Sequence, residues 1–88
     1  MYKVKDGFKV RKIGAQTMAV PTGRRTTELH GMLWLSESGA LLWQALTAGA
    51  EPEELARLLT EAYEVEPQRA LEDVERFLRG LAEQGVLE

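Results

Sequence analysis

The chain contains no cysteine and only one histidine among its 88 residues. Without cysteine it can form no disulfide, no thiolate metal site and no cysteine nucleophile, and this composition fits a reducing compartment. The single histidine, His30, leaves neither a histidine cluster for a metal ion nor a nucleophile–base pair. These absences argue against an enzyme, a metal site and a cofactor, and favour a binding or accessory protein.

Long apolar runs are also missing. No segment approaches the roughly 18–20 apolar residues that span a bilayer, and the N-terminal residues Met1–Asp6 lack the apolar centre of a signal peptide. Gly31 and Gly39 stand alone, so no glycine-rich loop forms a phosphate cradle between a strand and a helix. We therefore expect a cytoplasmic protein without a membrane partner.

The length predicts one small domain, residues 1–88, which buries only roughly 60–65% of the surface of its unfolded chain. Nearly every apolar residue must then contribute to one core, and no room remains for a second domain or a deep active site. Met1 and the short C-terminal end favour a stand-alone protein over an excised piece.

Charge is divided unevenly along the chain. Residues 1–30 carry seven basic and two acidic side chains, a net charge of +5, whereas residues 31–88 carry four basic and twelve acidic ones, a net charge of −8. Both halves can simply be solvated surface. The alternative is a charged protein or peptide partner, because complementary potentials speed encounter and fix orientation.

Strand patterns fill the first third of the chain. Phe8–Ile13 alternates apolar and basic residues, and Thr17–Val20 follows after a short turn at Gly14, which predicts an antiparallel hairpin. Pro21 closes the second strand, and a loop rich in turn residues and charge follows. Leu29–Leu35 is the predicted third strand.

Helical spacing of apolar residues follows in three segments. The first helix is predicted over Glu37–Thr47, the second begins at Pro52, and the third runs from Pro67 to an end at Gly85. Gly80 interrupts the third helix at a cost of roughly 1 kcal/mol relative to alanine. Either another backbone packs closely against it or the last turns are loosely held. Three strands followed by three helices predict an α+β fold, a three-stranded antiparallel meander with a winged helix-turn-helix-like arrangement.

Four segments, taken in order, give the chain a family resemblance. Ser36 stands where an N-cap hydroxyl can accept from the free N–H groups of the first helix. The segment around it resembles the strand-into-helix corner of the PqqD-like family, in which asparagine is frequent at this position. The matching segments are Gly7–Arg11, Val20–Gly23, Leu35–Trp43 and Asp73–Leu78.

This resemblance implies a peptide-recognition element. Members of the family bind the leader segment of a ribosomally made precursor peptide and present its core to a modifying enzyme, frequently a radical S-adenosylmethionine enzyme. The leader adds as an extra strand to the edge of the third strand and lies in the groove beside the last helix. Strand addition is physically reasonable, because a sheet edge offers unpaired N–H and C=O groups.

Carried onto this sequence, the resemblance names three sets of peptide-binding residues. They are the edge Met32, Leu33, Trp34 and Leu35, the groove wall Val74, Phe77, Leu78 and Leu81, and the rim Arg69, Asp73 and Arg76. Most of the apolar ones are expected in the core whatever the function, since so small a domain needs them.

Trp34 differs from its neighbours. If Leu33 and Leu35 face the helices, alternation turns Met32 and Trp34 to the opposite face of the sheet. There Trp34 could contact a partner or a dimer mate, or simply shield the sheet.

Two other classes of function stay open. A DNA-binding winged helix needs phosphate-neutralising side chains, yet the arginines of the last predicted helix are opposed by acidic residues and the pI is near 5.2. A dimerisation or scaffold domain without a peptide ligand is the other alternative. Retention on heparin would favour the first, and salt-insensitive self-association would favour the second.

Overall fold

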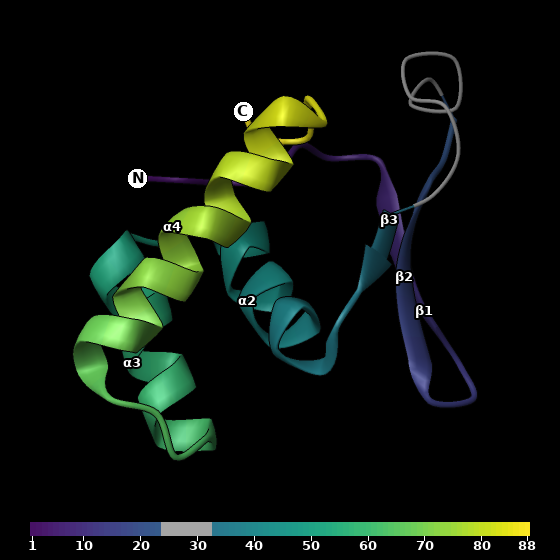
Figure 1. Cartoon of the computed structure of the whole chain (residues 1–88). Coiled ribbons are helices and arrows are strands. Elements are labelled where there is room, and N and C mark those ends of the chain that lie inside the picture. Colours follow the sequence, from purple (N-terminus) through teal and green to yellow (C-terminus); the bar gives the residue numbers. More distant parts are fainter. Residues whose placement is uncertain (24–32) are drawn as a thin grey trace.

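The computed structural model describes residues 1–23 and 33–88. Three antiparallel strands in the order β1-β2-β3 are followed by three helices, so the predicted α+β fold is confirmed (Figure 1). The elements are β1 Phe8–Ile13, β2 Gln16–Pro21, β3 Leu33–Leu35, α2 Glu37–Ala48, α3 Pro52–Ala62 and α4 Pro67–Glu83. The part of the predicted third strand that precedes Leu33, including Met32, lies outside the described residues.

One face of the sheet packs against the helices. Ala19 lies at the centre of this face, opposite Leu33 on β3, and is fully buried, and Leu35 is 8% exposed. Phe8 on β1 meets the ring of Trp43 on α2 edge-on, with 5.4 Å between ring centroids. The helix α2 therefore forms the contact between the sheet and the other two helices, α3 and α4.

Local capping explains where α2 begins and ends. The Ser36 hydroxyl accepts a hydrogen bond from the Gly39 N–H at 3.0 Å, as the sequence predicts for an N-cap. Gly49 follows the last residue of α2 with φ 98°, a conformation that glycine adopts without steric cost. Both α3 and α4 begin with proline, whose missing N–H would be unpaired in the first turn anyway.

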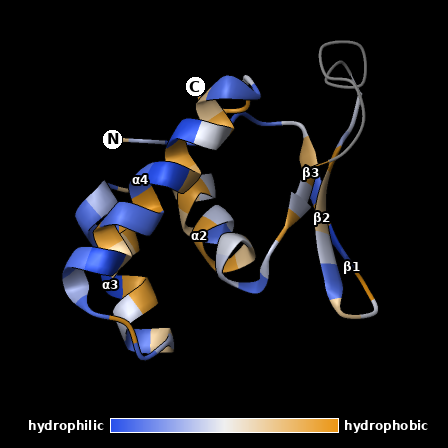
Figure 2. Ribbon diagram, in the orientation of Figure 1, coloured by the Kyte–Doolittle hydropathy of each residue, from blue (hydrophilic) through white to orange (hydrophobic). Residues whose placement is uncertain are grey.

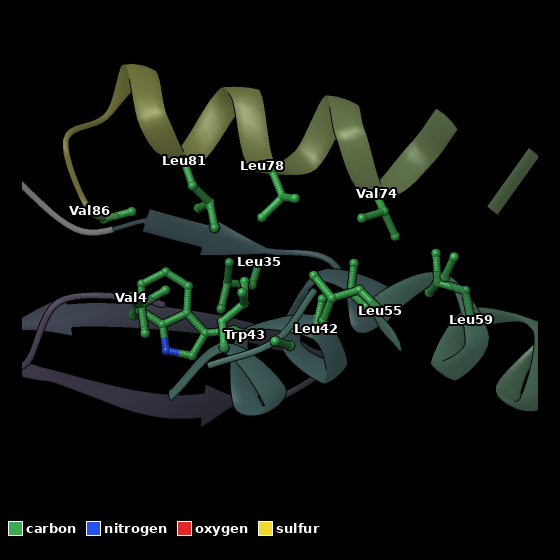
Figure 3. Packing of buried hydrophobic residues seen from close by; sticks show 14 of the residues in the cluster. Val4, Leu35, Leu42, Trp43, Leu55, Leu59, Val74, Leu78, Leu81 and Val86 are labelled. Atoms are coloured by element: carbon green, nitrogen blue, oxygen red, sulfur yellow. The ribbon is translucent and has the colours of Figure 1, made fainter. Parts of the chain in front are cut away.

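The core lies between the sheet and the three helices. Trp43, Leu55 and Val74, one from each helix, are 0–1% exposed, and Figure 3 shows Val74 pointing from α4 toward the residues of α2 and α3. Apolar residues gather where α3 and α4 face each other (Figure 2). This packing accounts for the three-four spacing of apolar residues in α4.

The N-terminal segment before β1 is part of the core, which the sequence pattern did not indicate. Tyr2 and Ala50 exchange two backbone hydrogen bonds of 2.9 and 2.8 Å, and Val4 forms an isolated bridge with Leu87. Val4 is 3% exposed. Residues 2–5 thus lie between the end of α2 and the segment after α4.

Gly80 lies on the exposed side of α4, and a Cβ added there would meet no atom within 4 Å. No other backbone in residues 1–23 or 33–88 packs against it, so the close-packing explanation is wrong. We expect Gly80→Ala to raise the free energy of unfolding by about 0.5–1 kcal/mol, because alanine has the higher helix propensity. Thermal unfolding should then shift upward by about 2–8 °C.

Gly85 supplies the control for this prediction. It also has open space around the Cβ position, but its φ is 75°, which side chains other than glycine rarely adopt. Gly85→Ala should therefore lower the free energy of unfolding by about 1 kcal/mol. A Gly80→Ala variant that melts below the unsubstituted protein would contradict the explanation from helix propensity.

Every helix in the part of the chain that the structure describes is too short or too polar to serve as a membrane span.

Candidate functional site

Among the described residues, no strand pairs with the edge of β3 that faces away from β2, and the outward backbone groups on this free edge belong to Trp34. In an antiparallel pair the strands alternate between residues that exchange hydrogen bonds and residues that do not. The Thr22 N–H donates to the Gly7 carbonyl at 2.8 Å, and the register continues without a bulge along β1 and β2. Thr22 thus turns its backbone N–H and C=O toward β1. Because this direction alternates from residue to residue, Ala19, three positions earlier, turns its own N–H and C=O toward Leu33 on β3. Since Trp34 follows Leu33, its own N–H and C=O point outward along the edge.

A cavity of about 550 Å³ begins at the residue that follows β3. It lies among the N-terminal turn of α2, the C-terminal end of α3 and the middle of α4. Its apolar lining comes from Leu42, Leu59, Tyr63, Val65 and Phe77, and its polar lining from Ser36, Glu37, Ser38, Asp73 and Arg76. The edge of β3 and this cavity together form what we call the edge groove.

Phe77 is the aromatic residue that α4 contributes to the edge groove. A Cβ added to Gly39 would lie 3.2 Å from the Cε1 atom of Phe77, so the ring packs directly against the first turn of α2. Phe77 is only partly buried, although it packs on the core. Its exposed part gives the groove an apolar surface that a ligand side chain can contact.

A hydrogen bond joins two helices at this cavity. The Tyr63 hydroxyl, at the end of α3, donates to the Glu37 carboxylate, at the start of α2, at 3.3 Å. Partial burial raises the pKa of Tyr63, and the negative charge of Glu37 and this hydrogen bond raise it further. Tyr63 therefore stays protonated and remains a donor across the neutral pH range.

Charged side chains of α4 lie beside the cavity in one small network. The Asp73 carboxylate is 3.4 Å from Arg69 Nε and 3.5 Å from Arg76 Nη1. All three side chains are at least one-third exposed, and ion pairs of this kind contribute little to folding. Their charges remain available to a ligand that enters the groove.

The structure brings together only part of the predicted site. Phe77, Asp73 and Arg76 line the cavity, and Arg69 lies in an adjoining hollow that also includes Asp73. In contrast, Val74, Leu78 and Leu81 are 0–5% exposed and point into the core (Figure 3), so they hold α4 in place instead of offering surface.

The edge residues are divided between the two faces of the sheet. Leu35 is buried and Leu33 partly buried on the helix side, whereas the Trp34 side chain is 61% exposed on the other side. Of these three residues, only Trp34 turns its backbone N–H and C=O toward the free edge, and its side chain lies on the outer face. The fourth predicted edge residue, Met32, is outside the described residues.

The predicted site did not include eight of the lining residues, which come from α2 with its N-cap, from α3 and from the α3–α4 connection. They are Ser36, Glu37, Ser38, Gly39, Leu42, Leu59, Tyr63 and Val65. Leu59 and Tyr63 belong to the apolar stripe of α3, so the signal was present in the sequence. The stripe could not indicate which of its members border a cavity. Among the described residues, no group of three or more histidine, aspartate or glutamate side chains could hold a metal ion.

An open sheet edge beside an apolar cavity is the arrangement by which domains bind an extended peptide as an added strand. Residues 20–87 match the sequence model of the PqqD family, described as coenzyme PQQ synthesis protein D. The chain belongs to the PqqD family.

Two solved structures are similar over nearly the whole chain. TbiB1 in complex with the TbiA(beta) leader peptide shares 26% identity over 98% of this chain and 94% of that chain, with a TM-score of 0.77. The lasso peptide synthetase B1 complexed with the leader peptide shares 25% identity over 99% and 96%, with a TM-score of 0.77. No curated protein matches the chain.

Proposed function

We propose that this chain binds the leader segment of a ribosomally synthesised precursor peptide and presents the peptide to a modifying enzyme. The observation that carries this proposal is the free edge of β3 together with the apolar cavity that begins at Ser36, the residue after this strand. Membership of the PqqD family supports it, as do two similar structures that are complexes with leader peptides.

The leader binds as a fourth strand. Its backbone pairs with the outward N–H and C=O of Trp34, which gives affinity without dependence on sequence. Alternate side chains of the added strand then face the helices, where an apolar one contacts Phe77. Asp73 and Arg76 meet charged groups of the leader and fix its position along the edge.

The chain acts as a binding protein and not as a catalyst. The chemistry belongs to its partner, for which the family resemblance suggests a radical S-adenosylmethionine enzyme. Affinity for the leader is moderate, because an unfolded peptide must be ordered as it binds. The proposed setting is the cytoplasm, where precursor peptides are made.

A titration followed by amide chemical shifts tests this function. The probe is a synthetic leader of a ribosomally made precursor peptide from the source organism of this chain. We expect the shifts to cluster at Leu33–Leu35 and along Ala70–Leu81. Shifts confined to the hairpin of β1 and β2, or no binding at all, would overturn the proposal.

The variant Asp73→Lys distinguishes a peptide-binding protein from a DNA-binding protein. Asp73 borders the cavity and is partly exposed, so the variant should fold and should lose about tenfold in leader affinity. A DNA-binding winged helix predicts tighter DNA binding instead, because a negative charge near phosphates is removed. Fluorescence anisotropy with a labelled leader and a labelled DNA duplex measures both.

Glu72→Lys is the matched control, since it makes the same charge change at an exposed position of α4 outside the cavity. Its leader affinity should stay within about twofold of the unsubstituted chain. Equal losses in Asp73→Lys and Glu72→Lys would mean that net charge, and not the edge groove, determines binding.

A further inference from the structure

The face of the sheet that points away from the helices carries a second group of exposed side chains. The register aligns Arg11, Met18 and Trp34 across the three strands on this face. Alternation along the strands adds the neighbouring positions on the same side. We call this surface the outer sheet face, and its residues are Lys9, Arg11, Ile13, Gln16, Met18, Val20 and Trp34.

Large apolar side chains are exposed on the outer sheet face. Trp34 is 61% exposed and Ile13 is 59% exposed, whereas Met18, which lies beside Trp34, is only 6% exposed. The helices cover only the opposite side, and the sheet stands at one end of the molecule (Figure 1). Tryptophan is also one of the residue types enriched among those that dominate protein–protein binding energy.

The charge of this surface has one sign. Lys9 and Arg11 lie on this face of β1, and residues 8–21 contain no acidic side chain. Within the described residues, neither of these two cations is in an ion pair with an acidic group. An acidic partner surface would therefore meet these cations on β1 and the exposed tryptophan on β3, on one face of the sheet, and such complementary charge steers encounter and fixes orientation.

We propose that the outer sheet face docks the modifying enzyme, through an acidic patch on that enzyme with an apolar centre. This inference rests on the proposed function, because an enzyme that acts on the bound peptide must contact this chain outside the edge groove. The outer sheet face lies on the other side of the same strands, so leader and enzyme are held together. Trp34 belongs to both surfaces: its backbone faces the leader and its side chain faces the enzyme.

A second copy of the chain fits less well. Its acidic surface is on the helices, and docking it against the outer sheet face would place α4, which borders the edge groove, in the interface. The leader and the second copy would then compete for the same helix.

Charge reversal on the outer sheet face tests the inference. The double variant Lys9→Glu/Arg11→Glu is compared with Arg57→Glu/Arg79→Glu, which makes the same change in net charge at exposed positions of α3 and α4. The probes are the synthetic leader and the purified enzyme that modifies the corresponding precursor peptide. Surface plasmon resonance gives both affinities, and sedimentation gives the oligomeric state.

We expect Lys9→Glu/Arg11→Glu to lose at least about tenfold in enzyme affinity, and we expect its enzyme binding to depend less on salt concentration. Its affinity for the leader should stay within about twofold of that of the unsubstituted chain. The control pair should keep both affinities. Unchanged enzyme affinity in Lys9→Glu/Arg11→Glu would overturn this inference and leave the proposed function standing. If this variant keeps its enzyme affinity but loses dimer formation or DNA binding, and the control pair does not, the outer sheet face serves that other partner and this inference is also overturned. Failure of the unsubstituted chain to bind the leader would instead overturn the proposed function.

Discussion

Replacing Trp34 by proline is expected to reduce affinity for the leader by at least about tenfold while leaving the fold intact. The Trp34 N–H points outward along the free edge, so proline removes a donor that the added strand needs, and its ring obstructs the approach of that strand. The β2–β3 ladder is spared, because its hydrogen bonds come from Leu33 and Leu35. A tenfold loss equals about 1.4 kcal/mol, which one or two lost hydrogen bonds and a steric clash can supply.

Trp34→Val is the matched variant for this test, since it removes the same aromatic side chain but keeps the N–H and a residue that favours strands. Isothermal titration calorimetry with the synthetic leader measures the affinity of both variants. The loss of leader affinity in Trp34→Pro should be about ten times larger than that in Trp34→Val. Circular dichroism checks that both variants fold. Equal losses would show that the leader contacts the indole ring, and strand addition at this edge would be wrong.

Trp43→Ala should have the largest effect on stability. Trp43 is 1% exposed, packs edge-on against Phe8 and belongs to the helix that joins the sheet to α3 and α4. Truncating such a residue typically costs about 3–5 kcal/mol, through lost burial and the cavity that remains. Since natural domains have about 5–15 kcal/mol of stability in total, the variant should be largely unfolded or melt far below the unsubstituted chain.

The same substitution at the other tryptophan is the control. The Trp34 side chain is 61% exposed, so Trp34→Ala should lower the free energy of unfolding by less than about 1 kcal/mol. Urea unfolding followed by circular dichroism measures both variants. Similar losses at the two positions would contradict the assignment of Trp43, and not Trp34, to the core.

Interactions between near neighbours in the chain were predictable from the sequence. The cap at Ser36, the prolines that begin α3 and α4, and the alternation of β1 each depend on residues a few positions apart. For that reason the predicted helix starts, and the exposure of Trp34, agree with the structure. The order of three strands and three helices, and the corner at Ser36, then sufficed for the α+β fold and the family.

The composition of the edge groove could not be predicted in the same way. Its lining comes from α2, α3 and α4, whose contributing residues lie up to about forty positions apart in the chain. Val74 and Phe77 follow the same helical pattern, yet packing against α2 and α3 buries the first and leaves the second at the cavity. A pattern marks the apolar side of a helix, but the neighbouring elements decide which part of that side stays open.

By itself, then, the sequence determined the elements, their order, the N-cap and the uneven division of charge, because these follow from local propensity and composition. Only the tertiary structure decided that Val4 enters the core between α2 and the C-terminal segment, and that the backbone of Trp34 points outward along the edge of β3. Both depend on hydrogen bonds between segments distant in sequence. Such bonds are fixed by strand register and packing, which no local pattern specifies.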